Sequence, residues 1–166
     1  MQQLKAFHDR ITAAGFAGAA LCVAIIVVSF WYEVAARYFF AAPTVWAYAL
    51  ASYVLAPMIF LAMPEMSRRG AQIVVDYFAA SLPEKIRNVL AILIAVSGAA
   101  ICLLCAWITF SETWRQFLSG DETISAWAVP KWWITAFTPY GLFSTSLYFL
   151  RQAFEGPAPK PAGEGL

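Results

Sequence analysis

The stretch Ile11–Tyr32, ITAAGFAGAALCVAIIVVSFWY, decides the fold class, because it contains no charged side chain. A helix needs about 20 predominantly apolar residues to cross the hydrocarbon core of a bilayer. Three later stretches share this property, namely Tyr38–Pro64, Asn88–Ser111 and Trp132–Leu150. A domain of 166 residues is too small to bury four such segments. The sequence therefore predicts an all-α membrane protein with four transmembrane helices.

The composition predicts one membrane domain with short ends. Hydrophobic residues make up 61% of the chain and charged residues 13%, against about 25% charged in a soluble domain. We expect an amphipathic N-terminal segment at residues 1–10, a transmembrane domain at 11–152 and a disordered tail at 153–166. The predicted spans are 11–32, 44–66, 87–111 and 131–151, and a short interfacial helix is predicted at Tyr77–Ser81 after the capping residue Asp76. A net charge of +1 without a basic stripe argues against nucleic-acid binding.

Positive charge predicts the orientation of the spans. With four spans, the N-terminus, the middle loop and the C-terminus share one side, which holds Lys5, Arg10, Arg68, Arg69, Lys85, Arg87, Arg151 and Lys160. The other side holds only Arg37, Arg115 and Lys131. The positive-inside rule therefore places both termini in the cytoplasm. Tryptophan, which favours the headgroup region, falls near the opposite ends of the spans, at residues 31, 46, 107, 114, 127, 132 and 133.

Rows of small residues at helical spacing predict close helix contacts. One row is Gly15, Ala19 and Cys22 in the first span, and the third span carries the rows Ala91, Ala95, Ala99 and Gly98, Cys102, Ala106. Such rows let another helix approach its neighbour closely in a membrane. The pattern does not distinguish packing within this chain from packing against a partner.

Ionisable residues are almost absent from the predicted spans, whereas a coupled transporter or proton relay usually has one there. Glu33 and Arg37 lie one helical turn apart at the end of the first span and are expected to pair. We predict a structural or interface role for this pair. Glu65, close to Arg68 and Arg69, predicts a surface ion pair.

The chain offers no recognisable chemistry of its own. Cys102 and Cys105 fall inside an apolar helix, where cysteine behaves as a small hydrophobe and its thiolate is disfavoured. His8 is the only histidine, so the chain cannot supply two haem ligands. We predict no catalytic residue, substrate site, metal site or cofactor. This pattern favours an accessory subunit. The alternatives are a membrane anchor of a redox complex, which should carry histidines inside its spans, and a small stand-alone exporter, which should carry a mid-membrane carboxylate.

Several segments together carry a family resemblance. They are Arg37-Tyr38-Phe39-Phe40, Pro43-Thr44-Val45-Trp46, Arg69-Gly70-Ala71-Gln72-Ile73-Val74-Val75-Asp76, Leu82-Pro83, Pro130-Lys131-Trp132-Trp133 and Pro139-Tyr140-Gly141. In order, spacing and span count, the chain resembles the small membrane subunit, DctQ-like or Q-type, of TRAP transporters, the tripartite ATP-independent periplasmic systems. The resemblance extends from about Ile11 to Arg151.

This resemblance implies a noncatalytic scaffold in the bacterial inner membrane. Family members bind a large multi-helix membrane subunit, here expected as a separate chain, that carries the substrate and sodium sites and moves like an elevator. A soluble periplasmic binding protein delivers an organic acid. The small subunit is similar to a fixed support that also helps to dock the binding protein, and besides lipid these two proteins are the expected partners.

The expected partner contacts lie at Glu33, Arg37, Trp46, Arg69, Gly70, Asp76, Trp132 and Trp133. Of these, Arg37, Trp46, Gly70 and Asp76 match the family pattern. Each also has a purely structural interpretation: Arg37 lies at the membrane interface, Trp46 belongs to the tryptophan belt, Gly70 stops a helix and Asp76 caps one. The chain departs from the pattern at Tyr48 and Ala49, where relatives commonly carry acidic residues, and at Gln72, where they often carry histidine.

Overall fold

The computed structural model describes residues 2–42, 44, 46–69, 83–123 and 128–155, and every regular element in these ranges is a helix. The helices are α1 (Gln2–Phe40), α2 (Trp46–Arg68), α4 (Glu84–Ser119), α5 (Lys131–Thr135) and α6 (Phe137–Glu155). The predicted all-α class is confirmed. The interfacial helix expected at Tyr77–Ser81 and the tail 156–166 lie outside the described residues.

Three of these helices are long and apolar enough to cross a membrane. The qualifying segments are Lys5–Phe40, Trp46–Arg68 and Ile86–Ser119. The fourth charge-free stretch, Trp132–Leu150, is divided between α5 and α6, and α6 does not qualify. Its hydropathy is lowered by Ser144, Thr145 and Ser146 and by Arg151 near its end. A fourth span through α6 therefore stays a prediction.

The long helices continue well past the charge-free stretches. α1 has 39 residues and is about 58 Å long, whereas the hydrocarbon core is about 30 Å thick. Residues 2–10, expected as an amphipathic N-terminal segment, form the first turns of α1, and residues 153–155, expected in the tail, belong to α6. Charges do not end the helices, because they pair along them: Glu33 with Arg37, and Glu112 with Arg115 at 3.0 Å.

Gly120 ends α4, and a short break at Ala136 divides α5 from α6. Gly120 has the left-handed φ of 66° and donates its N–H to the Gln116 carbonyl, so it closes α4 as a glycine cap. After a connection in which Glu122 and Pro130 form an isolated antiparallel bridge, α5 ends at Thr135. Pro139 lies in the first turn of α6, where its missing N–H removes no helical hydrogen bond.

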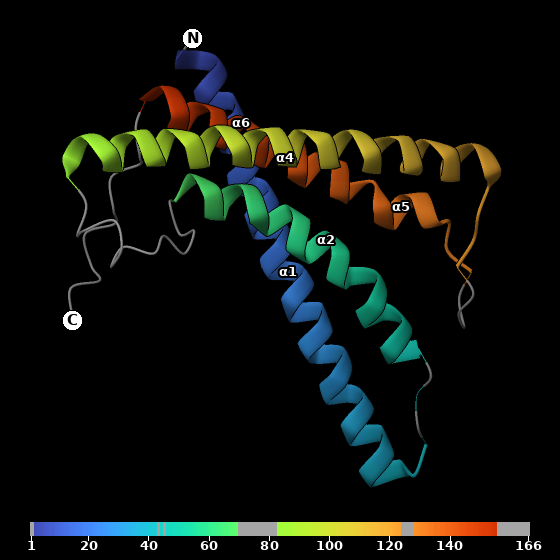
Figure 1. Cartoon of the computed structure of the whole chain (residues 1–166). Helices are drawn as coiled ribbons and strands as arrows, with labels where there is room; N and C mark the ends of the chain where they lie inside the picture. Colours follow the sequence, from blue (N-terminus) through green and yellow to red (C-terminus); the bar gives the residue numbers. More distant parts are fainter. Residues whose placement is uncertain (1, 43, 45, 70–82, 124–127, 156–166) are drawn as a thin grey trace, which may run out of the picture.

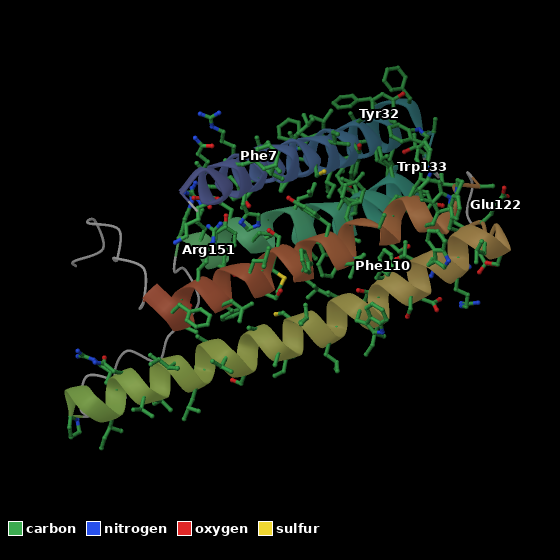
Figure 2. All side chains as sticks on the ribbon, turned by 90° about the horizontal axis from the view of Figure 1, so that it is seen from above. Phe7, Tyr32, Phe110, Glu122, Trp133 and Arg151 are labelled. Carbon is green, nitrogen blue, oxygen red and sulfur yellow. The ribbon has the colours of Figure 1, made fainter. Side chains whose placement is uncertain are left out.

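The helices form one layer in the order α1, α2, α6, α4 (Figures 1 and 2). α4 packs most extensively on α6, α1 packs on α2, and α2 packs on α6, while the short α5 touches α2 and α4. α1 and α4 are therefore the two edges of the layer and run obliquely to each other. These edge helices expose apolar side chains, among them Val28 on α1 and Leu93, Leu104 and Trp107 on α4.

Small residues make the helix contacts inside this chain. Ala95, Ala99, Cys102 and Ala106 of α4 are buried, and a Cβ atom on Gly98 would lie 3.1 Å from the ring of Phe149 in α6. A Cβ atom on Gly141 of α6 would lie only 2.3 Å from the carbonyl oxygen of Phe60 in α2. A Cβ atom on Gly15 of α1 would meet Leu61 of α2 at 3.5 Å. The small-residue rows thus pack within the layer.

Candidate functional site

The polar and aromatic side chains gather at the two ends of the layer. We call them the tryptophan end, which carries Trp46, Trp132 and Trp133, and the arginine end, which carries Arg68, Arg69 and Arg151. Figure 2 shows Trp133, Tyr32 and Glu122 toward one end and Arg151 and Phe7 toward the other. The candidate residues are therefore distributed over two surfaces at opposite ends of the helices.

At the tryptophan end, the predicted pair of Glu33 and Arg37 is formed. Glu33 is 2% exposed and Arg37 is half exposed, so the carboxylate is buried while its partner reaches the surface. The Arg37 Nη2 atom also lies 3.4 Å from the hydroxyl of Tyr48 on α2. Tyr48, which we expected to depart from the pattern of the family that the chain resembles, thus lies beside Arg37. A buried charge needs a partner in a membrane protein, and Arg37 supplies it.

Aromatic rings join α1 to α2 beside this pair. The Trp46 ring, at the start of α2, lies 5.5 Å from the Tyr32 ring, and the Tyr48 ring meets Phe30 edge to face at 5.8 Å. Such pairs contribute about 0.5–1.5 kcal/mol beyond their buried area. Tyr38 and Phe39 nearby are almost fully exposed. The end of α1 therefore presents an aromatic surface.

A second aromatic cluster joins α4 to α5 at the same end. The Trp132 ring meets Phe117 edge to face at 5.2 Å and Trp133 at 5.8 Å, and Trp133 is 59% exposed. The Thr135 hydroxyl donates to Gln116 Oε1 at 3.0 Å. Trp132 is thus anchored against α4, while Trp133 faces outward.

The loop before α5 is also tied to α2. The Tyr53 hydroxyl donates to Thr123 Oγ1 at 2.9 Å, and the Thr123 N–H donates to the Val129 carbonyl at 3.0 Å. The first bond joins the start of the loop to α2, and the second joins the start of the loop to its end. The loop is therefore attached to α2 at the tryptophan end.

At the arginine end, Glu65 of α2 is 1% exposed and forms ion pairs with two arginines. Its carboxylate accepts from Arg68 Nε at 2.7 Å and from Arg69 Nε at 2.8 Å. The Arg69 guanidinium also lies 5.1 Å from the centre of the Phe16 ring of α1, a cation–π distance. The expected ion pair is present, but the expectation of a surface pair is wrong, because the carboxylate lies inside the layer.

A polar network that the sequence analysis missed joins α1 to α6 at the arginine end. Asp9 Oδ1 accepts from Arg151 Nη1 at 2.9 Å and from the Tyr148 hydroxyl at 2.8 Å. His8 stacks on the Tyr148 ring at 4.7 Å, and its Nε2 lies 2.9 Å from Ser144 Oγ. One signal was present: Ser144, Tyr148 and Arg151 recur at the spacing of one helix face.

The predicted contact residues thus separate into groups. Glu33 and Arg37 are brought together, Trp132 and Trp133 are brought together, and Trp46 lies at the same end of the layer. Arg69 lies at the opposite end. Gly70 and Asp76, like Gln72, fall outside the described residues.

Within the described ranges, no three His, Cys, Asp or Glu side chains are grouped so as to hold a metal ion. Cys102 and Cys105 are free thiols, and Cys102 belongs to the buried row of α4.

Comparison with known proteins identifies the family. Residues 25–157 match the family described as "Tripartite ATP-independent periplasmic transporters, DctQ component". This range covers most of the chain, from the middle of α1 through α6. A comparison with curated proteins gives no match. The chain is a multi-pass membrane protein that belongs to the DctQ family, the small membrane subunit of TRAP transporters.

Proposed function

We propose that this chain is the noncatalytic scaffold of a sodium-coupled, binding-protein-dependent importer of organic acids. In this proposal it supports a large elevator-type membrane subunit and helps to dock the periplasmic binding protein. The observation that carries the proposal is the single layer of helices (Figure 2), whose edge helices α1 and α4 expose many large apolar side chains. A single layer formed by the described helices supports the proposal that a partner builds the route for a polar substrate.

The charged side chains support the same conclusion. Among the described residues, the buried carboxylates Glu33 and Glu65 are both paired with arginines on their own helices. A substrate or coupling ion needs polar groups that can exchange partners at membrane depth. Carboxylates already bonded to arginine stabilise helices in place. We therefore assign sodium and substrate binding to the large subunit.

The tryptophan end is the proposed site of partner contacts. Glu33, Arg37, Trp46, Trp132 and Trp133 all lie there, and their aromatic rings are fixed by neighbours on α1, α4 and α5. Fixed aromatic side chains are favoured in interfaces because little conformational freedom is lost on binding. Arg69 would contact a partner at the opposite end.

We also propose that α6 crosses the bilayer. Four spans place both termini on the same side, and the positive-inside rule makes this side the cytoplasm. Single cysteines at Phe7, Glu122 and Phe154, all exposed, can test this after Cys22, Cys102 and Cys105 are replaced by alanine. An impermeant thiol reagent should label only the Glu122 site in intact spheroplasts and the other two after permeabilisation. Labelling at Glu122 and Phe154 together, without Phe7, would indicate three spans.

Co-purification from mild detergent tests the scaffold function. We expect recovery with a large multi-helix membrane subunit, and sodium-driven uptake of an organic acid in liposomes only when that subunit and the binding protein are present. Uptake by the isolated chain would contradict the proposal. Recovery with a flavin or iron–sulfur subunit would instead support the redox-anchor alternative.

A further inference from the structure

We propose that a groove between α1 and α2 binds one anionic phospholipid, whose acyl chain lies in the groove and whose phosphate is held by Arg69. The groove has a volume of about 640 Å³. On α1 it is lined at helical spacing by Phe16, Ala20 and Val23, and on α2 by residues that include Ile59 and Met66. Its lining is almost entirely apolar, which suits a hydrocarbon chain.

The extent of the groove matches one leaflet of the bilayer. It runs along α2 from Met66 to Met58, and Arg69 lies just beyond. At 1.5 Å per residue, Met58 lies about 16 Å along the axis from Arg69, roughly half the thickness of the hydrocarbon core. A partner helix would need a contact surface across the full bilayer. A groove that ends near the midplane fits a single acyl chain instead.

The wall of the groove can adapt to a flexible ligand. Met58, Met63 and Met66 supply unbranched side chains that adjust to irregular shapes. The alanines on the facing sides keep the groove open, and exposed Ala20 lies on its rim. These features favour a hydrocarbon chain over a rigid ligand.

Arg69 stands at the mouth of the groove. Its guanidinium lies 5.1 Å from the Phe16 ring, which lines the groove, and its side chain is 54% exposed. The bond to Glu65 uses Nε, and a guanidinium has five N–H donors, so donors remain for phosphate oxygens. The mouth is at the end of the candidate span Trp46–Arg68, where we expect lipid headgroups.

Charge selects an anionic headgroup. Arg68 and Arg69 carry two positive charges, and Glu65 neutralises one of them. A headgroup with one net negative charge completes the balance, whereas a zwitterionic headgroup brings its own cation to the same place. Phosphatidylglycerol should therefore bind in preference to phosphatidylethanolamine.

Native mass spectrometry of the purified chain, with either lipid added to mild detergent, tests the proposal. Arg69→Gln should weaken phosphatidylglycerol retention about tenfold, because a charge-assisted bond is lost. Arg87→Gln on α4 is the charge-matched control and should retain the lipid. Ala20→Phe should fill the groove and release the lipid, while Ala17→Phe, exposed on the same helix but outside the groove, should not.

Circular dichroism should show equal helicity for all four variants, which separates lipid loss from unfolding. Equal retention of the two lipids would overturn the proposal, and so would equal loss from Arg69→Gln and Arg87→Gln. A third outcome would also overturn it. If Ala20→Phe abolishes co-purification with the large subunit while the wild-type chain retains no lipid, the groove is a protein interface.

Discussion

The arginine end and the tryptophan end of the helix layer use polar side chains in different ways. At the arginine end, Asp9 of α1 bonds Tyr148 and Arg151 of α6, so charge and hydrogen bonds connect helices distant in the sequence. At the tryptophan end, the charged pair Glu33 and Arg37 lies along one helix. Large aromatic side chains remain exposed there. Both ends join helices, the arginine end through charged and hydrogen-bonded side chains and the tryptophan end mainly through aromatic rings.

The largest effect is expected where α2 and α6 approach each other most closely, at Gly141. Gly141→Val would place side-chain atoms against the Phe60 carbonyl of α2, where even a Cβ atom would lie at 2.3 Å. We expect a loss of about 3 kcal/mol in the free energy of unfolding, because backbone must move. Unfolding in mild detergent followed by circular dichroism measures it.

Gly98→Ala is the control for this substitution. Its new Cβ atom would lie 3.1 Å from the Phe149 ring, a side chain that can shift, so the cost should stay near about 1 kcal/mol. Equal costs for the two glycine substitutions would show that α2 and α6 do not pack backbone to backbone.

At the arginine end, Asp9→Ala should cost about 2 kcal/mol in the free energy of unfolding. It removes the shared acceptor and leaves the largely covered Arg151 without its ion pair, while the Tyr148 hydroxyl keeps only its bond to Thr12 Oγ1 at 3.0 Å. Tyr148→Phe, which removes only one hydroxyl, should cost about 1 kcal/mol. A wild-type unfolding profile for Asp9→Ala would contradict the role of this network.

At the tryptophan end, Trp133→Ala should affect recognition more than stability. The side chain is mostly exposed, so the free energy of unfolding should change by only about 0.5 kcal/mol. Its loss should weaken binding to the partner subunits about tenfold, measured by titration in detergent. Phe154→Ala, which removes a more exposed ring at the arginine end, is the control and should leave binding unchanged.

The smallest change in the free energy of unfolding is expected at Tyr48, and it is compared with the change at Tyr148. The Tyr48 hydroxyl lies 3.4 Å from Arg37 at an exposed position, whereas the buried Tyr148 hydroxyl lies 2.8 Å from Asp9. Tyr48→Phe should therefore change the free energy of unfolding by at most about 0.5 kcal/mol. A cost equal to that of Tyr148→Phe would remove the distinction between the two ends.

The sequence predicted the long helices well, because an apolar stretch of about 20 residues without a charge is typical of a membrane-spanning helix. It placed the helix ends less well. α1 continues through Glu33 and Arg37 to Phe40, since paired charges one turn apart are compatible with a helix. A charge marks the end of an apolar stretch and not the end of the helix.

The contacts between segments distant in the chain could not be predicted from the sequence. His8 and Ser144 are 136 positions apart, and their spacing alone cannot show that α6 returns to the start of α1. Tyr48 was recognised as a departure from the family pattern, but only the structure shows its hydroxyl beside Arg37. The small-residue rows predicted close packing, and the structure shows which helix each row meets.

The oblique course of α1 relative to α4 has a mechanical consequence for the membrane (Figure 1). Two long helices that are not parallel cannot both stand along the bilayer normal, so at least one is tilted. Each is also longer than the hydrocarbon core is thick, and tilt is the usual way to resolve such hydrophobic mismatch. The angle between α1 and α4 is fixed by α2 and α6, so the subunit cannot adjust each tilt separately. Bilayer thickness therefore acts on the orientation of the whole layer, and with it on any partner that the layer supports.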